Sequence, residues 1–390
     1  MNTISHAQSL AALLLACPVS AIAGDVWVVD ETGTADFTDI QPAVNAAASG
    51  DTILVLPGNY QGFAIDGKSL SVAGDTSQFI FVHGTARVRN IGQNKSVTLS
   101  SIELRSGLRV NDCAGHVGIA DSVLRPEGLS FVNDDGLLGS HQIVNSADVV
   151  ISRSIVLGRD GVRDNYCSDV YDGYDGESAL LLFNSSAALY SCQVQGGEGG
   201  RSHDGNCAFA CTGAYQSDGG AGVRATGASL LYLDDTIPVG GLKGLHGSLC
   251  STPDHHDGEP VDLQVPAELE LAAEPVLKFA GGTVIREGLP LATTVNGPIG
   301  TLVWMIWSNG AKWRPFGGTV GLLHLNSNDL TLQQIGSIPA SGSLVTSFMP
   351  PAVLGGMEAR RVYIQVFGVD PGVGRILGTS TALDILDPAF

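Results

Sequence analysis

Short apolar stretches recur in pairs along the chain from residue 52 to about residue 241. Val97, Val117 and Val149 lie in equivalent stretches at offsets of 20 and 32 residues, and Asn145 repeats as Asn184 at an offset of 39. A period of about 20 residues, lengthened by insertions, is typical of a solenoid in which each strand pairs with its equivalent one turn away. We therefore expect a stack of parallel strands, at 52–56, 69–72, 96–99, 102–104, 116–119, 122–124, 149–151, 155–157, 188–190 and 192–194.

Three asparagines open strand pairs at corresponding places: Asn111, Asn145 and Asn184. Asparagine tolerates the tight backbone of a turn, and identical residues stack on one another in a solenoid. We expect these side chains to form an inward-facing ladder, which is a structural role.

Residues 37–51 show the features of a short helix. Phe37, Ile40 and Val44 fall on one face, Thr38 and Gln41 have the spacing of a capping box, and Gly50 marks the end. The apolar strand that follows at once predicts that this helix covers the exposed first coil of the stack.

Composition and charge narrow the possible partners. Glycine is 51 of 390 residues, charged residues are 15%, and the net charge is −19. A strongly acidic surface repels phosphates, so neither nucleic acid nor an anionic lipid surface is an expected partner. No apolar run of bilayer-spanning length follows the N-terminus, so we expect no membrane span.

The first 23 residues predict a signal peptide, with an apolar region from Leu10 to Cys17 and a small-residue cleavage pattern ending at Ala23. The segment lacks Lys and Arg, and Leu14 to Cys17 has some likeness to a lipoprotein signal that would anchor the chain through Cys17. Both interpretations predict a secreted or cell-surface protein.

Export permits disulfide bonds. Six cysteines follow the predicted signal peptide, and their pairing is open among 15 connectivities. The alternatives are buried free thiols or, for the last closely spaced pair, a zinc site. The candidates are Cys113, Cys167, Cys192, Cys207, Cys211 and Cys250.

Two insertions interrupt the coil, at 158–178 and 196–222, and loops on a rigid scaffold are where function usually resides. The first is rich in carboxylates and tyrosines. Carboxylates at short spacing predict a calcium site, and tyrosine rings suit the apolar faces of sugars. A solvated acidic loop is the plainer alternative. The candidate calcium ligands are Asp169, Asp172 and Asp175, and the candidate carbohydrate contacts are Tyr166, Tyr171 and Tyr174.

Composition changes near residue 250. We expect the parallel coil at 24–249, a polar linker at 250–262 and a β-sandwich at 263–390. The predicted sandwich strands are 300–308, 320–325, 344–348, 361–369 and 377–386.

The stretch from Thr34 to Ala47, followed by Gly50 to Tyr60, resembles the N-terminal cap and first coil of the pectin lyase-like superfamily. The resemblance implies an all-β, right-handed parallel β-helix with a short N-terminal capping helix. The segments 336–342 and 363–370 are similar to modules appended to secreted bacterial surface proteins.

No complete catalytic motif of that superfamily is present. Gly139-Ser140-His141 departs from the Gly-His-Gly of polygalacturonases, and the Gln and Asp motifs of methylesterases do not occur. The first hypothesis is therefore a secreted β-helix protein that binds or associates with extracellular polysaccharide, with calcium as a possible cofactor. The alternatives are a polysaccharide lyase or glycoside hydrolase with an unrecognised site, and a structural or adhesive surface protein. The sequence leaves the oligomeric state open.

Overall fold

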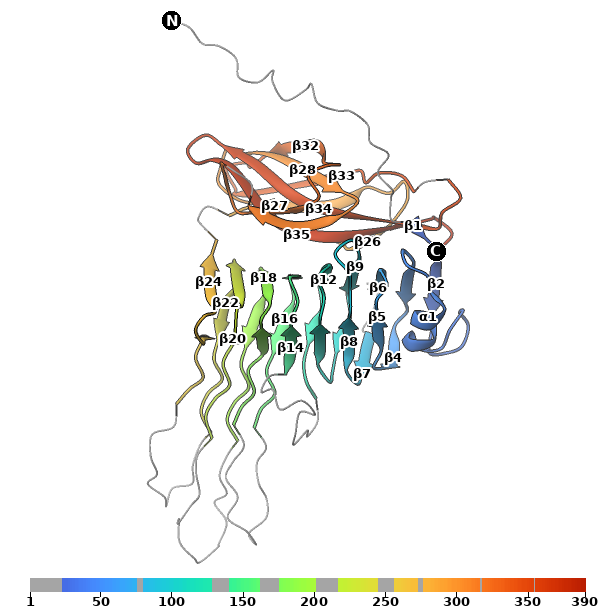
Figure 1. The fold of residues 1–390 in the computed structure, drawn as a ribbon. Helices are drawn as coiled ribbons and strands as arrows, with labels where there is room; N and C mark the ends of the chain where they lie inside the picture. Colours follow the sequence, from blue (N-terminus) through green and yellow to red (C-terminus); the bar gives the residue numbers. More distant parts are fainter. Residues whose placement is uncertain are drawn as a thin grey trace, which may run out of the picture.

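The computed structural model is nearly all β-structure and describes residues 23–75, 80–127, 140–161, 175–200, 217–244, 256–272, 276–315, 318–353 and 355–390. The strands between residues 26 and 272 form three long parallel sheets, which the chain visits in turn (Figure 1). We call this part the coil stack. It has the arrangement expected of a β-helix solenoid. No helix in the described ranges is both long enough and apolar enough to cross a bilayer.

Sheet I has nine strands: β2 (Val26–Val29), β3 (Thr52–Val55), β6 (Leu70–Gly74), β9 (Ser96–Ser100), β12 (His116–Ala120), β15 (Asp148–Ser152), β18 (Ser186–Tyr190), β21 (Leu230–Asp234) and β24 (Glu268–Leu271). Sheet II has seven: β4 (Gly58–Gln61), β7 (Ile80–His83), β10 (Glu103–Leu104), β13 (Val123–Leu124), β16 (Ile155–Leu157), β19 (Gln193–Gln195) and β22 (Ile237–Val239). Sheet III also has seven: β5 (Ala64–Asp66), β8 (Ala86–Arg89), β11 (Leu108–Asn111), β14 (His141–Val144), β17 (Leu180–Phe183), β20 (Val223–Thr226) and β23 (Val261–Leu263).

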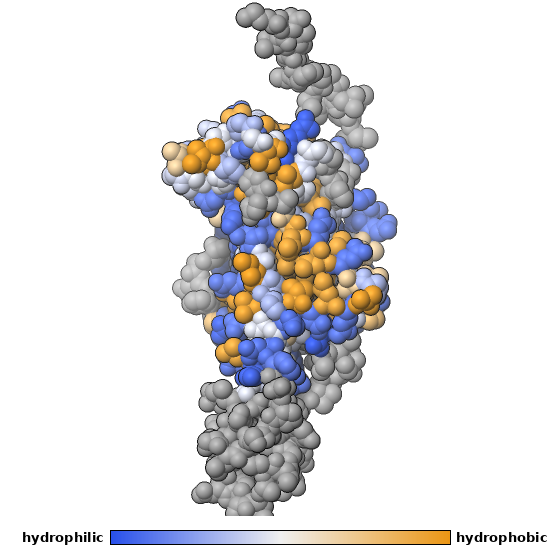
Figure 2. Space-filling model, turned by 90° about the vertical axis from the view of Figure 1, so that its left-hand side faces the viewer, coloured by the Kyte–Doolittle hydropathy of each residue, from blue (hydrophilic) through white to orange (hydrophobic). Residues whose placement is uncertain are grey.

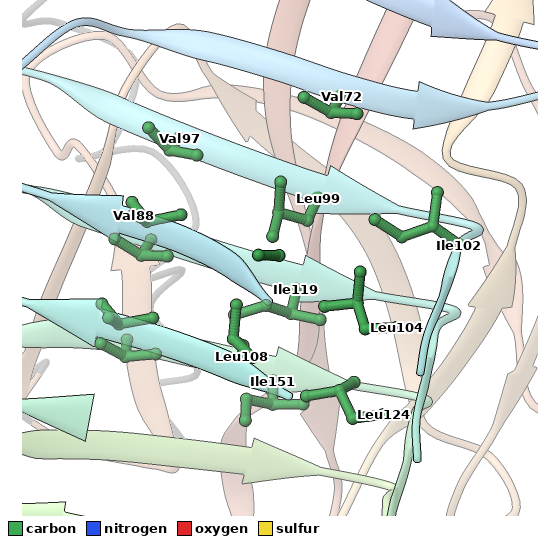
Figure 3. Close-up of a cluster of buried hydrophobic side chains, with 14 of the residues drawn as sticks. Val72, Val88, Val97, Leu99, Ile102, Leu104, Leu108, Ile119, Leu124 and Ile151 are labelled. Carbon is green, nitrogen blue, oxygen red and sulfur yellow. The ribbon is translucent and has the colours of Figure 1, made fainter. Parts of the chain in front are cut away.

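The core of the coil stack consists of columns of apolar side chains, one from each coil. In sheet I, Leu99 pairs with Ile119 and Ile119 with Ile151, and all three are buried. Figure 3 shows these side chains meeting Leu104 and Leu124 of sheet II in the interior. The offsets that the sequence predicted are confirmed, because Val97 pairs with Val117 and Val117 with Val149.

The predicted inward asparagine ladder is wrong. Asn145 and Asn184 occupy left-handed turn positions, with φ of 49° and 48°, but their side chains are exposed. Asn111 ends β11, one position before its turn. Asparagine is favoured there because its side chain tolerates the left-handed backbone, and the residue that follows points inward instead.

Small polar side chains form the inward ladder at this corner. The Ser185 hydroxyl accepts from the Ser146 N–H at 3.0 Å, and the Ser146 hydroxyl accepts from the Cys113 N–H at 3.2 Å. A second ladder at the corner between sheets I and II includes Cys192, whose N–H donates to Thr236 at 3.0 Å. These hydroxyls satisfy buried backbone donors where the sheet hydrogen bonds are interrupted.

The helix α1 (Ile40–Ala46) is shorter than predicted and begins at a different residue. Asp39, rather than Thr38, is the N-cap, and its carboxylate accepts from the Ile40 N–H at 2.8 Å. Gln41 does not reach back to the cap, because its amide oxygen accepts from the Ala64 N–H at 2.6 Å. Ile40 and other apolar residues of α1 belong to the buried core of the coil stack.

The coils continue further than the sequence suggested. Strand β23 pairs with β20, and β24 pairs with β21, so residues 261–271 extend sheets III and I rather than forming a linker or part of the C-terminal domain.

The C-terminal part is built from mainly antiparallel sheets. One contains β26 (Val284–Arg286), β35 (Gly374–Leu386), β34 (Ala359–Asp370), β28 (Leu302–Ser308) and β32 (Thr331–Ser337), with β1 (Ala23–Gly24) on β34 and β30 (Thr319–Val320) on β35. The others contain β25 (Lys278–Gly281), β27 (Leu291–Asn296) and β33 (Ser343–Phe348), and the pair β29 (Ala311–Pro315) and β31 (Leu322–Leu325). Phe279 and Phe348 of the three-stranded sheet share a buried cluster with Val303 and Ile364 of the larger sheet.

The serine ladder leads to a first prediction. Ser185→Ala removes the acceptor of the buried Ser146 N–H and should lower the free energy of unfolding by about 1–3 kcal/mol. Ser185→Cys should cost less, because cysteine occupies the equivalent position in another coil. Urea unfolding measures both. Ser341→Ala, at an exposed serine, is the control, and equal stability of Ser185→Ala and this control would contradict the ladder's role.

Candidate functional site

Three insertions lie between sheets II and III; the sequence nominated the first two, and the third lies where the sequence predicted the end of the coil and a linker. They follow β16, β19 and β22, and their described ends run out from the coil stack as extended segments (Figure 1). Three segments lead away from the stack, at 158–161, 196–200 and 240–244. Three return to it, at 175–178, 217–222 and 256–260. We call these six segments the glycine bundle.

Hydrogen bonds within the glycine bundle recur every third residue. The N–H groups of Gly158 and Gly161 donate to the carbonyls of Gln195 and Glu198, both at 2.7 Å. A repeat of three residues is that of the polyproline II helix, which makes no internal hydrogen bonds and leaves its backbone groups free for neighbours. The same spacing recurs in the donor pairs Gly196 and Gly199, Gly219 and Gly222, and Gly241 and Gly244.

Further backbone bonds join the outgoing segments to the returning ones. They run in a zigzag through the three insertions: Glu177 N–H to Arg159 O, Gly197 to Glu177, Gly220 to Gly197, Gly241 to Gly220 and Gly258 to Gly241, at 2.8–2.9 Å. The six segments are therefore one hydrogen-bonded array and not three separate loops.

Glycine is required at several contact points of the array, because a side chain would overlap a neighbouring carbonyl group. A Cβ atom on Gly197 would lie 1.8 Å from the Arg159 carbonyl oxygen, and one on Gly241 would lie 1.8 Å from the Gly197 carbonyl oxygen. The sequence shows this requirement as glycines that occur in adjacent pairs three residues apart, as in the segment from Gly196 to Gly200. The glycine content alone, without the spacing of the glycines, does not predict the array.

Only one of the three predicted calcium ligands lies in the described part of the chain. Asp169 and Asp172 lie outside the described residues. Asp175 is exposed, and its carboxylate accepts from the Asp218 backbone N–H at 2.8 Å. Within the described ranges, no group of three or more His, Cys, Asp or Glu side chains could hold a metal ion.

The predicted carbohydrate contacts Tyr166, Tyr171 and Tyr174 lie outside the described residues, as do Cys167, Cys207, Cys211 and Cys250. The disulfide prediction is wrong for Cys113 and Cys192. Both are buried free thiols in the two ladders, where each takes the place of a serine or threonine. Burial raises the pKa of Cys192 to about 11, so this thiol is unreactive at neutral pH.

A polar cluster lies where the glycine bundle meets the coil stack. The Ser140 hydroxyl donates to the Glu177 carboxylate at 2.9 Å and accepts from the Arg159 N–H at 2.7 Å. Arg159 also pairs with Glu177 at 3.4 Å. The hydroxyl thus joins the Glu177 carboxylate to the Arg159 backbone at the base of the glycine bundle.

The neighbouring His141 is fully buried and has both ring nitrogens occupied by backbone groups. Its Nδ1 accepts from the Leu108 N–H at 3.1 Å, and its Nε2 donates to the Leu157 carbonyl at 3.1 Å. Burial lowers its pKa to about 4, so the ring is neutral at pH 7. Because both nitrogens are bound to backbone, His141 holds the coils together and is not available as a catalytic base.

A second polar region lies between the coil stack and the C-terminal sheets, and sequence reasoning did not find it. The outer face of sheet I is buried here. Tyr190 meets His324 through a hydroxyl–imidazole hydrogen bond, and Ser71 donates to Asp384 at 2.5 Å. Asp384 in turn pairs with the buried Arg361 at 2.9 Å.

Asp148 joins the two parts directly. One carboxylate oxygen lies 3.1 Å from Nδ1 of His116, and the other accepts from the Trp313 N–H at 3.4 Å. Burial lowers the pKa of His324, also at this junction, to about 3. The cavity beside these groups gives a water molecule about 20 Å³ of room, which suits one or two waters and is too small for a sugar. The junction therefore has the character of a structural contact.

Replacing a contact glycine tests the array. Gly197→Ala should disrupt the glycine bundle while leaving the sheets intact, because its methyl group would overlap a backbone carbonyl, at a cost of about 1–3 kcal/mol. Hydrogen exchange should speed up in 196–200 and 217–222 and stay unchanged in the core strands. Gly92→Ala, where no atom lies within 4 Å of the added Cβ, is the control. Unchanged exchange in the bundle would contradict the arrangement.

Replacing His141 tests its neutral, buried state. The folded-state pKa of about 4 lies below the usual 6.5, so the unfolded chain binds more protons between these values and stability falls as the pH decreases from 6.5 to 4. His141→Gln should be less stable at pH 7 but should lose less stability over this range, by up to about 1.4 kcal/mol per pH unit. Urea midpoints from pH 7 to pH 4 measure this. A slope identical to that of the wild type would contradict it, and His83→Gln is the control.

Comparisons with known proteins give little further information. No family model matches the sequence, and no curated protein matches it. Among solved structures, the chain is similar to a superoxide reductase (neelaredoxin) from Ignicoccus hospitalis, with 8% identity and a TM-score of 0.17. The match covers 28% of this chain and 80% of that one, and at this TM-score it carries no argument about fold or function.

Proposed function

We propose that this chain is a secreted parallel β-helix protein that binds extracellular polysaccharide through the insertions carried by the glycine bundle. The observation that carries the proposal is the hydrogen-bonded array of six segments. It fixes the bases of three insertions side by side, and a rigid support for neighbouring segments reduces the entropy lost on binding a ligand.

The proposal includes a finer description of the fold. The coil is right-handed and of the pectin lyase-like type, α1 is its N-terminal cap, and the two C-terminal sheets with a shared core form a sandwich. The stacked parallel sheets, the packing of α1 against the first coil and the sequence from Thr34 to Tyr60 support this description.

The first insertion supplies the chemistry. Tyr166, Tyr171 and Tyr174 offer flat apolar faces and hydroxyl groups to sugar rings. Asp169, Asp172 and Asp175 offer the oxygen ligands that calcium prefers, and a bound calcium ion would neutralise carboxylates on the protein or on an acidic polysaccharide. An acidic chain of net charge −19 needs such a cation to approach an acidic polymer.

Binding to a panel of acidic and neutral polysaccharides, with calcium and with chelator, tests this function. Tyr171→Ala with Tyr174→Ala should weaken binding to the retained polymer at least about 10-fold, which corresponds to about 1.4 kcal/mol. Replacing Asp169, Asp172 and Asp175 with Asn should abolish any calcium dependence. Asp25→Asn, at an exposed carboxylate directly before β2, is the matched control.

The same incubation separates the alternatives. Unsaturated products would replace the binding function with that of a lyase, and new reducing ends would replace it with that of a hydrolase. Absence of binding across the panel would overturn the proposal in favour of a structural or adhesive role. If the affinity for the polysaccharide is the same in the wild type, the tyrosine variant and the aspartate variant, the assignment of the binding site to the first insertion would be wrong.

A further inference from the structure

The coil stack ends with its hydrophobic core open to solvent. Leu269 and Leu271 of β24 continue the columns of Leu231 and Leu233, and Leu263 of β23 continues that of Ala225. The preceding residues are buried, whereas Leu263, Leu269 and Leu271 are 39%, 37% and 65% exposed. The last coil therefore lacks the cover that each earlier coil receives from the next.

Other apolar side chains enlarge this surface, which we call the open end. Val265, in the turn between β23 and β24, is 95% exposed. Figure 2 looks onto this end and shows apolar residues gathered in the middle of the coil stack. Soluble monomers rarely expose a contiguous apolar surface of this kind, and it commonly marks an interaction site. The outer face of β22 adds Ile237 and Val239 beside it.

The opposite end of the stack cannot accept the open end of another molecule. Helix α1 packs there against the first coil, and Lys68 fixes it by donating to the carbonyls of Val44 and Ala47 at 2.6 and 2.8 Å. The segment at Phe37 covers part of the edge of β2, since Phe37 exchanges backbone hydrogen bonds with Val28 and Asp30. Head-to-tail stacking, which would give an open filament, is thereby blocked.

We propose that the open end binds the open end of a second copy of this chain, giving a closed two-fold dimer. The two-fold axis lies perpendicular to the long axis of the stack. Viewed along the stack, the chain therefore winds in opposite directions in the two terminal coils that face each other. Every facing pair of terminal strands is therefore antiparallel, a favourable arrangement for strands. Leu263, Leu269 and Leu271 of one copy then meet the same residues of the other, so an apolar centre covers an apolar centre.

The charged groups of the last coil stay outside the apolar centre, and those of the two copies repel one another at low salt. Glu268 and Glu270 alternate with Leu269 and Leu271 along β24, so their carboxylates lie on the outer face and away from the apolar centre. Pro238 lies at the middle of the edge strand β22 and has no N–H to donate. Full strand addition at β22 is thus prevented, and side-chain burial at β23 and β24 provides the contact. The proposal does not depend on what the insertions bind.

Sedimentation velocity and light scattering of the purified chain test the dimer. The wild type should have the mass of two chains, and higher salt should strengthen association because each copy carries a net charge of −19. Leu269→Glu with Leu271→Glu should give a monomer, with the dissociation constant raised at least about 100-fold. Val345→Glu, at a residue 77% exposed on the C-terminal part, should remain a dimer.

A further variant protects the test against misfolding. Val265→Glu alters an almost fully exposed side chain, so it should weaken the dimer yet keep the wild-type melting temperature when both proteins are diluted to monomers. A monomeric wild type at about 100 µM would overturn the proposal. So would a Leu269→Glu, Leu271→Glu variant that folds and remains dimeric.

Discussion

Each coil of this protein is held by hydrogen bonds to the coils on either side, which places equivalent residues about 4.8 Å apart along the stack. The register is continuous from Val72 through Leu99 and Ile119 to Ile151, and each of these side chains is buried. A shift of one residue in any strand would turn its apolar side chains outward. The ladders at the corners, the position of the insertions and the outer faces of the sheets all follow from this register.

The glycine bundle is a direct consequence of the same spacing. Because the insertions leave the stack at the same corner of successive coils, their first residues are forced to lie close together. The backbones approach until carbonyl oxygens occupy the space that a Cβ atom would need, as at Gly197 and Gly241. In this crowded array the six extended segments satisfy their backbone N–H and C=O groups through hydrogen bonds to neighbouring segments, without forming a β-sheet. The polar cluster at Ser140, Arg159 and Glu177 ties the base of this array to the coil stack.

The junction with the C-terminal part shows why residue type alone does not identify a site. The outer face of sheet I carries His116, Asp148 and Tyr190, residues that would suit chemistry on an open surface. The C-terminal strands bury this face, and some of their side chains hydrogen-bond with it, as His324 does with Tyr190 and Asp384 with Ser71. A neutral buried His324 beside Tyr190, and the ion pair of Arg361 with Asp384, join the two parts of the chain.

The sequence by itself determined the parallel coil, ten of the strands in sheets I and II, and the places along the chain where two insertions interrupt it; the strands of sheet III were not predicted. These features depend on local patterns: apolar stretches of strand length, turn residues and a period of about 20 residues. Only the tertiary structure decided which turn residues face inward, why Cys113 and Cys192 are unpaired, and that coils continue to Leu271. It also decided that the acidic Asp175 accepts a backbone hydrogen bond from another insertion. Each of these depends on contacts between residues 30 or more positions apart, for which a sequence pattern read along one strand contains no signal.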